Sequence, residues 1–124
     1  MEPVRVLIVD DEDELVSALE QRLNLRGLEA RGVTTGADAL VCLEEWACDV
    51  VLLDVKMPGI GGLELIKRIK EMQPHLQVIL LTGWSSAEDA EKGKRLGAYD
   101  YLIKPVKIDD LVKVLLSATA REEG

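Results

Sequence analysis

The stretch VVLLDVKMPG, residues 50–59, decides how this chain is expected to fold. Its first four residues are all apolar, which is typical of a strand that is buried on both faces of a parallel sheet. Asp54 follows this apolar run, and Pro58 and Gly59 then favour a turn. A carboxylate at the end of a buried strand raises the question of which other side chains meet it at that edge of the sheet.

Strand patterns and helix patterns alternate five times along the chain. The strand patterns cover residues 4–10, 29–34, 49–54, 77–82 and 99–103, and the second is the most polar, as in an edge strand. Helical patterns follow over residues 11–27, 35–46, 61–72, 85–97 and 107–120. This alternation predicts an α/β fold, in which a single doubly wound, flavodoxin-like sheet of five parallel strands carries five helices on its two faces.

Length and charge limit the classes of protein to which the chain can belong. Its 124 residues predict one domain, residues 1–124, which either stands alone or has lost a segment that followed it. The net charge of −8 argues against direct binding of nucleic acids or anionic membranes. No apolar run approaches the ~20 residues that cross a bilayer, and no signal peptide is visible, so we expect a cytoplasmic protein.

The chain has two cysteines, Cys42 and Cys48, and a single histidine, His75. A structural zinc site needs four ligands, so these three residues do not predict one. We expect both cysteines to be reduced and to pack as small apolar residues, and His75 to lie in a loop beside Pro74.

Polar side chains follow several of the predicted strands where those strands end: Asp10, Asp11, Asp54, Thr82 and Lys104. Ligands bind beyond the carboxyl ends of the strands in open parallel sheets, so we expect these groups to converge. Clustered carboxylates repel one another unless a cation lies among them, and their oxygens suit Mg²⁺. A lysine and a hydroxyl beside them suit an anion, so the set has the parts of a phosphoryl-transfer site with a carboxylate nucleophile.

Four motifs in this order resemble the receiver domain of two-component response regulators: VDDE at 9–12, LLDVKMPG at 52–59, LLTGW at 80–84 and YLIKP at 101–105. The resemblance extends from Val4 to about residue 120. It implies that Asp54 accepts a phosphoryl group from a sensor histidine kinase or a phosphotransfer protein. It also implies that Asp11, Asp54 and the backbone carbonyl of Lys56 bind Mg²⁺, with Asp10 helping through water.

The resemblance assigns roles to the later motifs as well. It implies that Thr82 hydrogen-bonds the phosphoryl group, that Lys104 pairs with it, and that Tyr101 is an aromatic switch residue that turns inward when Thr82 moves. It also implies a cis peptide before Pro105. The plainer alternatives are helix capping for Asp10 and Asp11, with Glu12 as a cap or a solvated acid, and simple packing for Tyr101.

The same resemblance places a signalling surface on the fourth helix, fifth strand and fifth helix, at residues 87–98, 99–103 and 108–118. A partner, or a second copy of the chain in a homodimer, would bind there. The domain would then be a switch that catalyses only its own phosphorylation and dephosphorylation, and not an enzyme with a separate substrate.

Three alternatives stay open at this point. The chain could be a receiver-like interaction module that takes no phosphate. It could be a Mg²⁺-dependent aspartyl phosphatase, although Lys56 stands where haloacid-dehalogenase-like phosphatases typically carry a second acid. A nucleotide-binding flavodoxin-like protein is disfavoured because the first strand-to-helix turn is acidic and has no glycine loop.

Two residues that flank the site suggest a long-lived phosphorylated state. Lys56 follows Asp54 by two positions, and Trp84 follows Thr82 by two positions. We expect the Lys56 ammonium to reach a phosphate oxygen and the Trp84 ring to shield the phosphoryl group from water. The alternative for Trp84 is packing on the fourth helix or on a partner.

Overall fold

The computed structural model describes residues 2–57, 61–83 and 87–119 of the chain. Its five strands are β1 (Arg5–Val9), β2 (Glu29–Val33), β3 (Val50–Asp54), β4 (Gln77–Thr82) and β5 (Asp100–Ile103). They form one sheet in the order β2-β1-β3-β4-β5, and every neighbouring pair is parallel. The predicted fold class is therefore confirmed, including the edge position of the polar strand β2.

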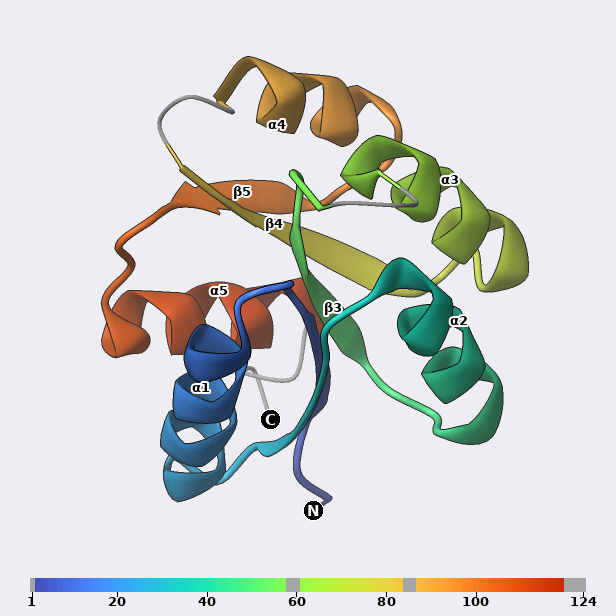
Figure 1. Cartoon of the computed structure of the whole chain (residues 1–124). Coiled ribbons are helices and arrows are strands. Elements are labelled where there is room, and N and C mark those ends of the chain that lie inside the picture. Colours follow the sequence, from blue (N-terminus) through green and yellow to red (C-terminus); the bar gives the residue numbers. More distant parts are fainter. Residues whose placement is uncertain (1, 58–60, 84–86, 120–124) are drawn as a thin grey trace.

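Five helices connect the strands: α1 (Asp13–Leu25), α2 (Gly36–Glu45), α3 (Gly62–Met72), α4 (Ala87–Arg95) and α5 (Ile108–Thr119). Helices α1 and α5 cover one face of the sheet, whereas α2, α3 and α4 cover the other (Figure 1). Each predicted element is present to within two residues at the ends that the structure describes. The turn predicted at Pro58 and Gly59 and the side chain of Trp84 lie outside the described residues.

Two apolar cores lie on opposite faces of the sheet because successive strand residues point to opposite sides. In β1, Val6 and Ile8 pack with α1 and α5, whereas Leu7 and Val9 pack with α2, α3 and α4. Strand β3 is buried along its whole length, as expected for a central parallel strand. The only polar residues buried in the described part of the chain are Asp10, Asp54 and Thr82, which all lie at or just beyond strand ends.

Local features agree with the sequence at several points. Helix α1 ends before Gly27, which has a φ of 90°, and Leu28 donates its backbone N–H to Leu23 O across this turn. The peptide bond between Lys104 and Pro105 is cis, as the resemblance implied. Cys42 on α2 and Cys48 just after this helix are free thiols that pack against the core, and burial raises the pKa of Cys48 to about 12.

Candidate functional site

The site lies where β1 and β3 run side by side in the middle of the sheet. The chain leaves β1 toward α1 on one face and leaves β3 toward α3 on the other, so this is the position at which the connections change sides (Figure 1). Open parallel sheets hold their ligands beyond the strand ends at such a switch point. Asp10 directly follows β1, and Asp54 is the last residue of β3.

Three carboxylates meet at this edge. One oxygen from each of Asp10, Glu12 and Asp54 lies within 4.8 Å of the others. Asp10 and Asp54 are buried, with 1% and 7% of their surfaces exposed, whereas Glu12 is exposed. Backbone amides orient the two aspartates: Glu12 N donates to Asp10 Oδ1 at 3.0 Å, and Lys56 N donates to Asp54 Oδ1 at 3.0 Å.

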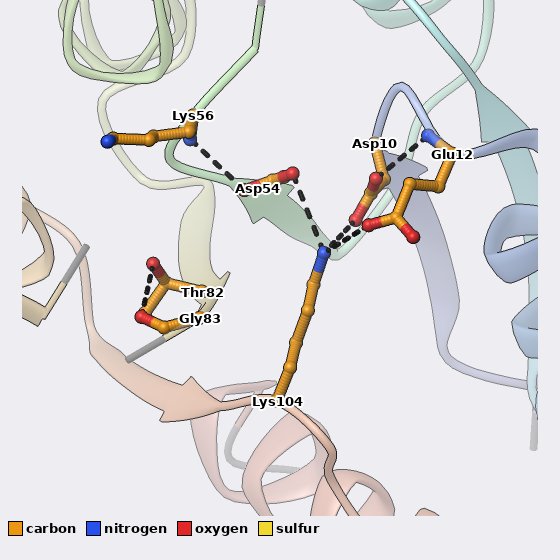
Figure 2. A network of polar contacts seen from close by, with 7 residues as sticks. All are labelled: Asp10, Glu12, Asp54, Lys56, Thr82, Gly83 and Lys104. Carbon is orange, nitrogen blue, oxygen red and sulfur yellow. Dashed lines mark hydrogen bonds and ion pairs between the residues drawn. The ribbon is translucent and has the colours of Figure 1, made fainter. Parts of the chain in front are cut away.

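The ammonium group of Lys104 reaches all three carboxylates (Figure 2). Its Nζ lies 3.0 Å from Asp10 Oδ2, 3.1 Å from Glu12 Oε1 and 3.6 Å from Asp54 Oδ2. The backbone of Lys104 is held at the end of β5 because its N–H donates to Thr82 O on β4 at 2.6 Å. Strand ends that are far apart in sequence thus bring one cation and three anions together.

The charges at this edge are only partly balanced. Burial raises the pKa of Asp54 above its ordinary value of 3.8, and the nearby charge of Asp10 adds to this rise. The Lys56 N–H and the Lys104 ammonium oppose it. Burial alone would lower the pKa of Lys104, but hydrogen bonds to Asp10 and Glu12 outweigh it, so the pKa is raised. The pocket therefore favours additional positive charge.

The raised pKa of Asp54 leads to a prediction about stability and pH. The folded state holds the Asp54 proton more tightly than the unfolded state, so ionisation of this group lowers stability as the pH rises from the unfolded value of 3.8 through the folded value. Asp54→Asn removes this effect. We expect urea denaturation in metal-free buffer to show that Asp54→Asn gains more in free energy of unfolding, relative to the wild type, above the unfolded pKa of 3.8 than below it. A gain that stays constant or shrinks would contradict the raised pKa.

Thr82 ends β4, and Tyr101 lies on the neighbouring strand β5. Thr82 is fully buried at the end of β4, and among the described residues its hydroxyl makes one long hydrogen bond, of 3.4 Å, to Gly83 O. Tyr101 is partly exposed and lies beside α4, where the nearby Glu91 carboxylate raises the pKa of its phenol. The Nζ of Lys94 lies 5.8 Å from the centre of the Tyr101 ring. In this arrangement Tyr101 belongs to the surface that α4 and β5 share.

The predicted site residues are placed as follows. The structure brings Asp10, Asp54 and Lys104 together, with the backbone of Lys56 beside them. Asp11 is exposed and is not part of the close carboxylate group. The Lys56 side chain extends away from the Asp54 carboxylate in Figure 2.

Sequence reasoning missed the contact of Glu12 with Lys104. Glu12 is the N-cap residue of α1, but its side chain makes no capping hydrogen bond and bonds Lys104 instead. Its position within VDDE was a possible signal, yet a solvated acid or a cap would look the same in the sequence.

A groove of about 440 Å³ opens beside the charged cluster, between α1 and the connection from β5 to α5. Glu12 and Lys104 form part of its lining. The rest of the lining is mostly apolar and consists of Leu15, Ala18, Leu19, Arg22, Leu81, Pro105 and Val106.

Among the described residues, no helix is both long and apolar enough to cross a membrane.

Comparisons with known proteins agree with this geometry. A family model described as the response regulator receiver domain matches residues 6–116. The chain is 37% identical over 107 residues to the regulatory protein AtoC of Escherichia coli K12, covering 86% of this chain and 23% of AtoC. It is 39% identical over 110 residues to the DNA-binding transcriptional regulator NtrC of the same strain, covering 89% of this chain and 24% of NtrC. The chain thus spans about a quarter of the length of these relatives.

A solved structure gives the same result for the fold. The crystal structure of a response regulator receiver domain protein from Clostridium thermocellum matches with a TM-score of 0.90 and 31% sequence identity. The match covers 97% of this chain and 97% of that chain. The likeness therefore extends over the whole sheet and its helices.

Proposed function

The chain belongs to the response regulator receiver domain family, and from this premise we propose that it is a phosphorylation-controlled switch in two-component signal transduction, with Asp54 as its Mg²⁺-dependent phosphoryl acceptor. The observation that carries the proposal is the meeting of Asp54 with two further carboxylates and the Lys104 ammonium at the switch point of the sheet. The donor would be a sensor histidine kinase or a phosphotransfer protein. A bond forms between an Asp54 oxygen and phosphorus as the bond from phosphorus to the donor's imidazole nitrogen breaks.

The residues present fit a Mg²⁺ ion. The donor atoms around Asp54 are carboxylate oxygens, and Asp10 and Asp54 are buried. Burial raises the pKa of Asp54, and the charges of Asp10 and Asp11 act on it in the same direction. We propose that Asp11, Asp54 and the Lys56 carbonyl hold the ion, with Asp10 acting through water. When bound, the ion supplies positive charge to the oxygens of the phosphoryl group.

The other residues of the site support the transfer and its readout. Lys104 Nζ lies close enough to Asp54, at 3.6 Å, to pair with a phosphoryl oxygen on it after a small movement. The Thr82 hydroxyl, which makes a long hydrogen bond of 3.4 Å to Gly83 O, would donate to a second oxygen instead. Tyr101 would follow Thr82 inward and leave its contacts with α4, so that the surface of α4, β5 and α5 changes. That surface would bind a partner or a second copy of the chain.

Three further parts of the proposal concern the cellular context. We propose a cytoplasmic domain that catalyses only its own phosphorylation and dephosphorylation. The net charge of −8 disfavours direct contact of this domain with nucleic acid. The relative NtrC is named a DNA-binding transcriptional regulator, and this chain matches about a quarter of it.

Intact mass spectrometry with acetyl phosphate as the donor tests the proposal without a partner protein. We expect the mass of one phosphoryl group to be added in the presence of Mg²⁺ and none to be added in EDTA, because the buried carboxylates would repel an anionic donor without the ion. No adduct under either condition would favour the phosphate-independent interaction module. Continuous turnover of p-nitrophenyl phosphate, in place of one modification per chain, would favour the aspartyl phosphatase.

A further inference from the structure

Glu12 differs from the other two partners of Lys104 in its exposure. The side chain of Glu12 is 61% exposed, whereas those of Asp10 and Asp54 are 2% and 9% exposed. Glu12 and Lys104 also share the wall of the groove beside α1, which Asp10 and Asp54 do not line. The ammonium therefore has two partners inside the pocket and one at its mouth (Figure 2).

We propose that Glu12 is a positioning residue that keeps hold of the Lys104 ammonium when a Mg²⁺ ion occupies the pocket. The inference rests on the proposed function, since it concerns the same cation and the same lysine. In the absence of the ion the ammonium donates hydrogen bonds to Asp10 and Glu12 and forms an ion pair with Asp54 at 3.6 Å. An ion held by Asp11 and Asp54, with Asp10 acting through water, would draw the oxygens of Asp10 and Asp54 away from the ammonium. Glu12 would then be the acid at the mouth of the pocket that remains within reach of Lys104.

The energetic argument follows from this exchange of partners. Without the ion, removal of Glu12 would leave the Lys104 ammonium with two carboxylate partners, Asp10 and Asp54. With the ion bound, removal of Glu12 would take away the partner on which the ammonium then depends, so the loss would be larger. The contact of Glu12 with Lys104 is therefore stronger with the ion bound, and Glu12 eases binding of the ion. Lys104 also stays at the mouth, beside Asp54, where a phosphoryl group would arrive.

The local backbone makes Glu12 a suitable position for a test. The backbone of Glu12 is held by hydrogen bonds that its side chain does not make: its N–H donates to Asp10, and its carbonyl accepts from Val16 N at 3.0 Å. The side chain makes no capping hydrogen bond in α1. Replacing Glu12 by glutamine is therefore not expected to disturb the start of the helix.

A double-mutant cycle on Mg²⁺ affinity tests the inference. Isothermal titration calorimetry would give the dissociation constant for Mg²⁺ of the wild type, Glu12→Gln, Lys104→Met and the double variant. We expect Glu12→Gln to raise this constant about threefold in the wild type, in the range of exposed charge pairs, and to have no more than a marginal effect in the Lys104→Met background. Glu14→Gln, the same change at an exposed position of the first turn of α1, serves as the control.

Each outcome of the cycle decides the question. An equal effect of Glu12→Gln in both backgrounds would mean that Glu12 acts on the ion and not through Lys104, which overturns the inference. If Glu12→Gln raises the dissociation constant for Mg²⁺ no more than Glu14→Gln does, the inference is overturned as well. It is also overturned if the wild type binds no Mg²⁺. If the wild type binds Mg²⁺ and takes up one phosphoryl group while the cycle is flat, the inference fails and the proposed function stands.

Discussion

Asparagine in place of Asp54 is expected to abolish uptake of a phosphoryl group from acetyl phosphate while the fold stays intact. The variant keeps the size of the side chain and an oxygen that can accept the Lys56 N–H bond of 3.0 Å. It lacks the anionic oxygen that attacks phosphorus, and an amide is a far weaker nucleophile. Intact mass spectrometry in Mg²⁺ should therefore show unmodified protein where the wild type gains one phosphoryl group.

Asp38→Asn is the matched control because it removes one carboxylate from an exposed position in the first turn of α2. We expect it to take up phosphate like the wild type. Circular dichroism should show the Asp54→Asn variant to be folded and at least as stable as the wild type, since a buried carboxylate with a raised pKa has been removed. Full modification of Asp54→Asn would place the acceptor on another residue of the chain and would remove Asp54 from the proposed chemistry.

The sequence predicted the fold well because its strongest patterns belong to the central strands. β3 and β4 are apolar almost throughout and are covered on both faces, so their sequences leave little choice of structure. The ends of elements were less certain. The first helix was expected from residue 11 but begins at Asp13, because the Glu12 N–H bonds the Asp10 side chain and the backbone turns before the helix starts.

The convergence of Asp10, Asp54 and Lys104 could also be predicted, since the carboxyl ends of parallel strands meet at one edge of a sheet. Contacts that depend on how helices pack were beyond the sequence. The proximity of Tyr101 to Glu91 arises because α4 packs against β5, and nothing in either segment indicates that pairing. The groove beside α1 depends in the same way on the distance between α1 and Pro105.

Alanine at Gly62 is expected to destabilise the protein strongly, because the chain comes close to itself just beyond Asp54. Gly62 N donates to Val55 O at 3.1 Å, which ties the start of α3 to the residue after the proposed acceptor. A Cβ atom on Gly62 would lie 2.2 Å from Val55 O and 2.7 Å from Val55 C, and these are backbone atoms that no side-chain rotation can move. We expect a loss of about 3 kcal/mol in the free energy of unfolding, measured by urea denaturation.

Gly61→Ala provides a control at the adjacent position with the same chemical change. No heavy atom of the described residues would lie within 4 Å of a Cβ atom there. The backbone of Gly61, with φ of −65° and ψ of 157°, is accessible to alanine. We expect this variant to be as stable as the wild type or to gain about 0.4–1 kcal/mol, because alanine restricts the unfolded chain. The contrast between the two variants separates the close approach at Gly62 from the general effect of losing a glycine. Equal stabilities would mean that the connection after Asp54 adapts to the added methyl group. In that case the contact between Val55 and Gly62 would not hold the loop that begins at the phosphoryl acceptor.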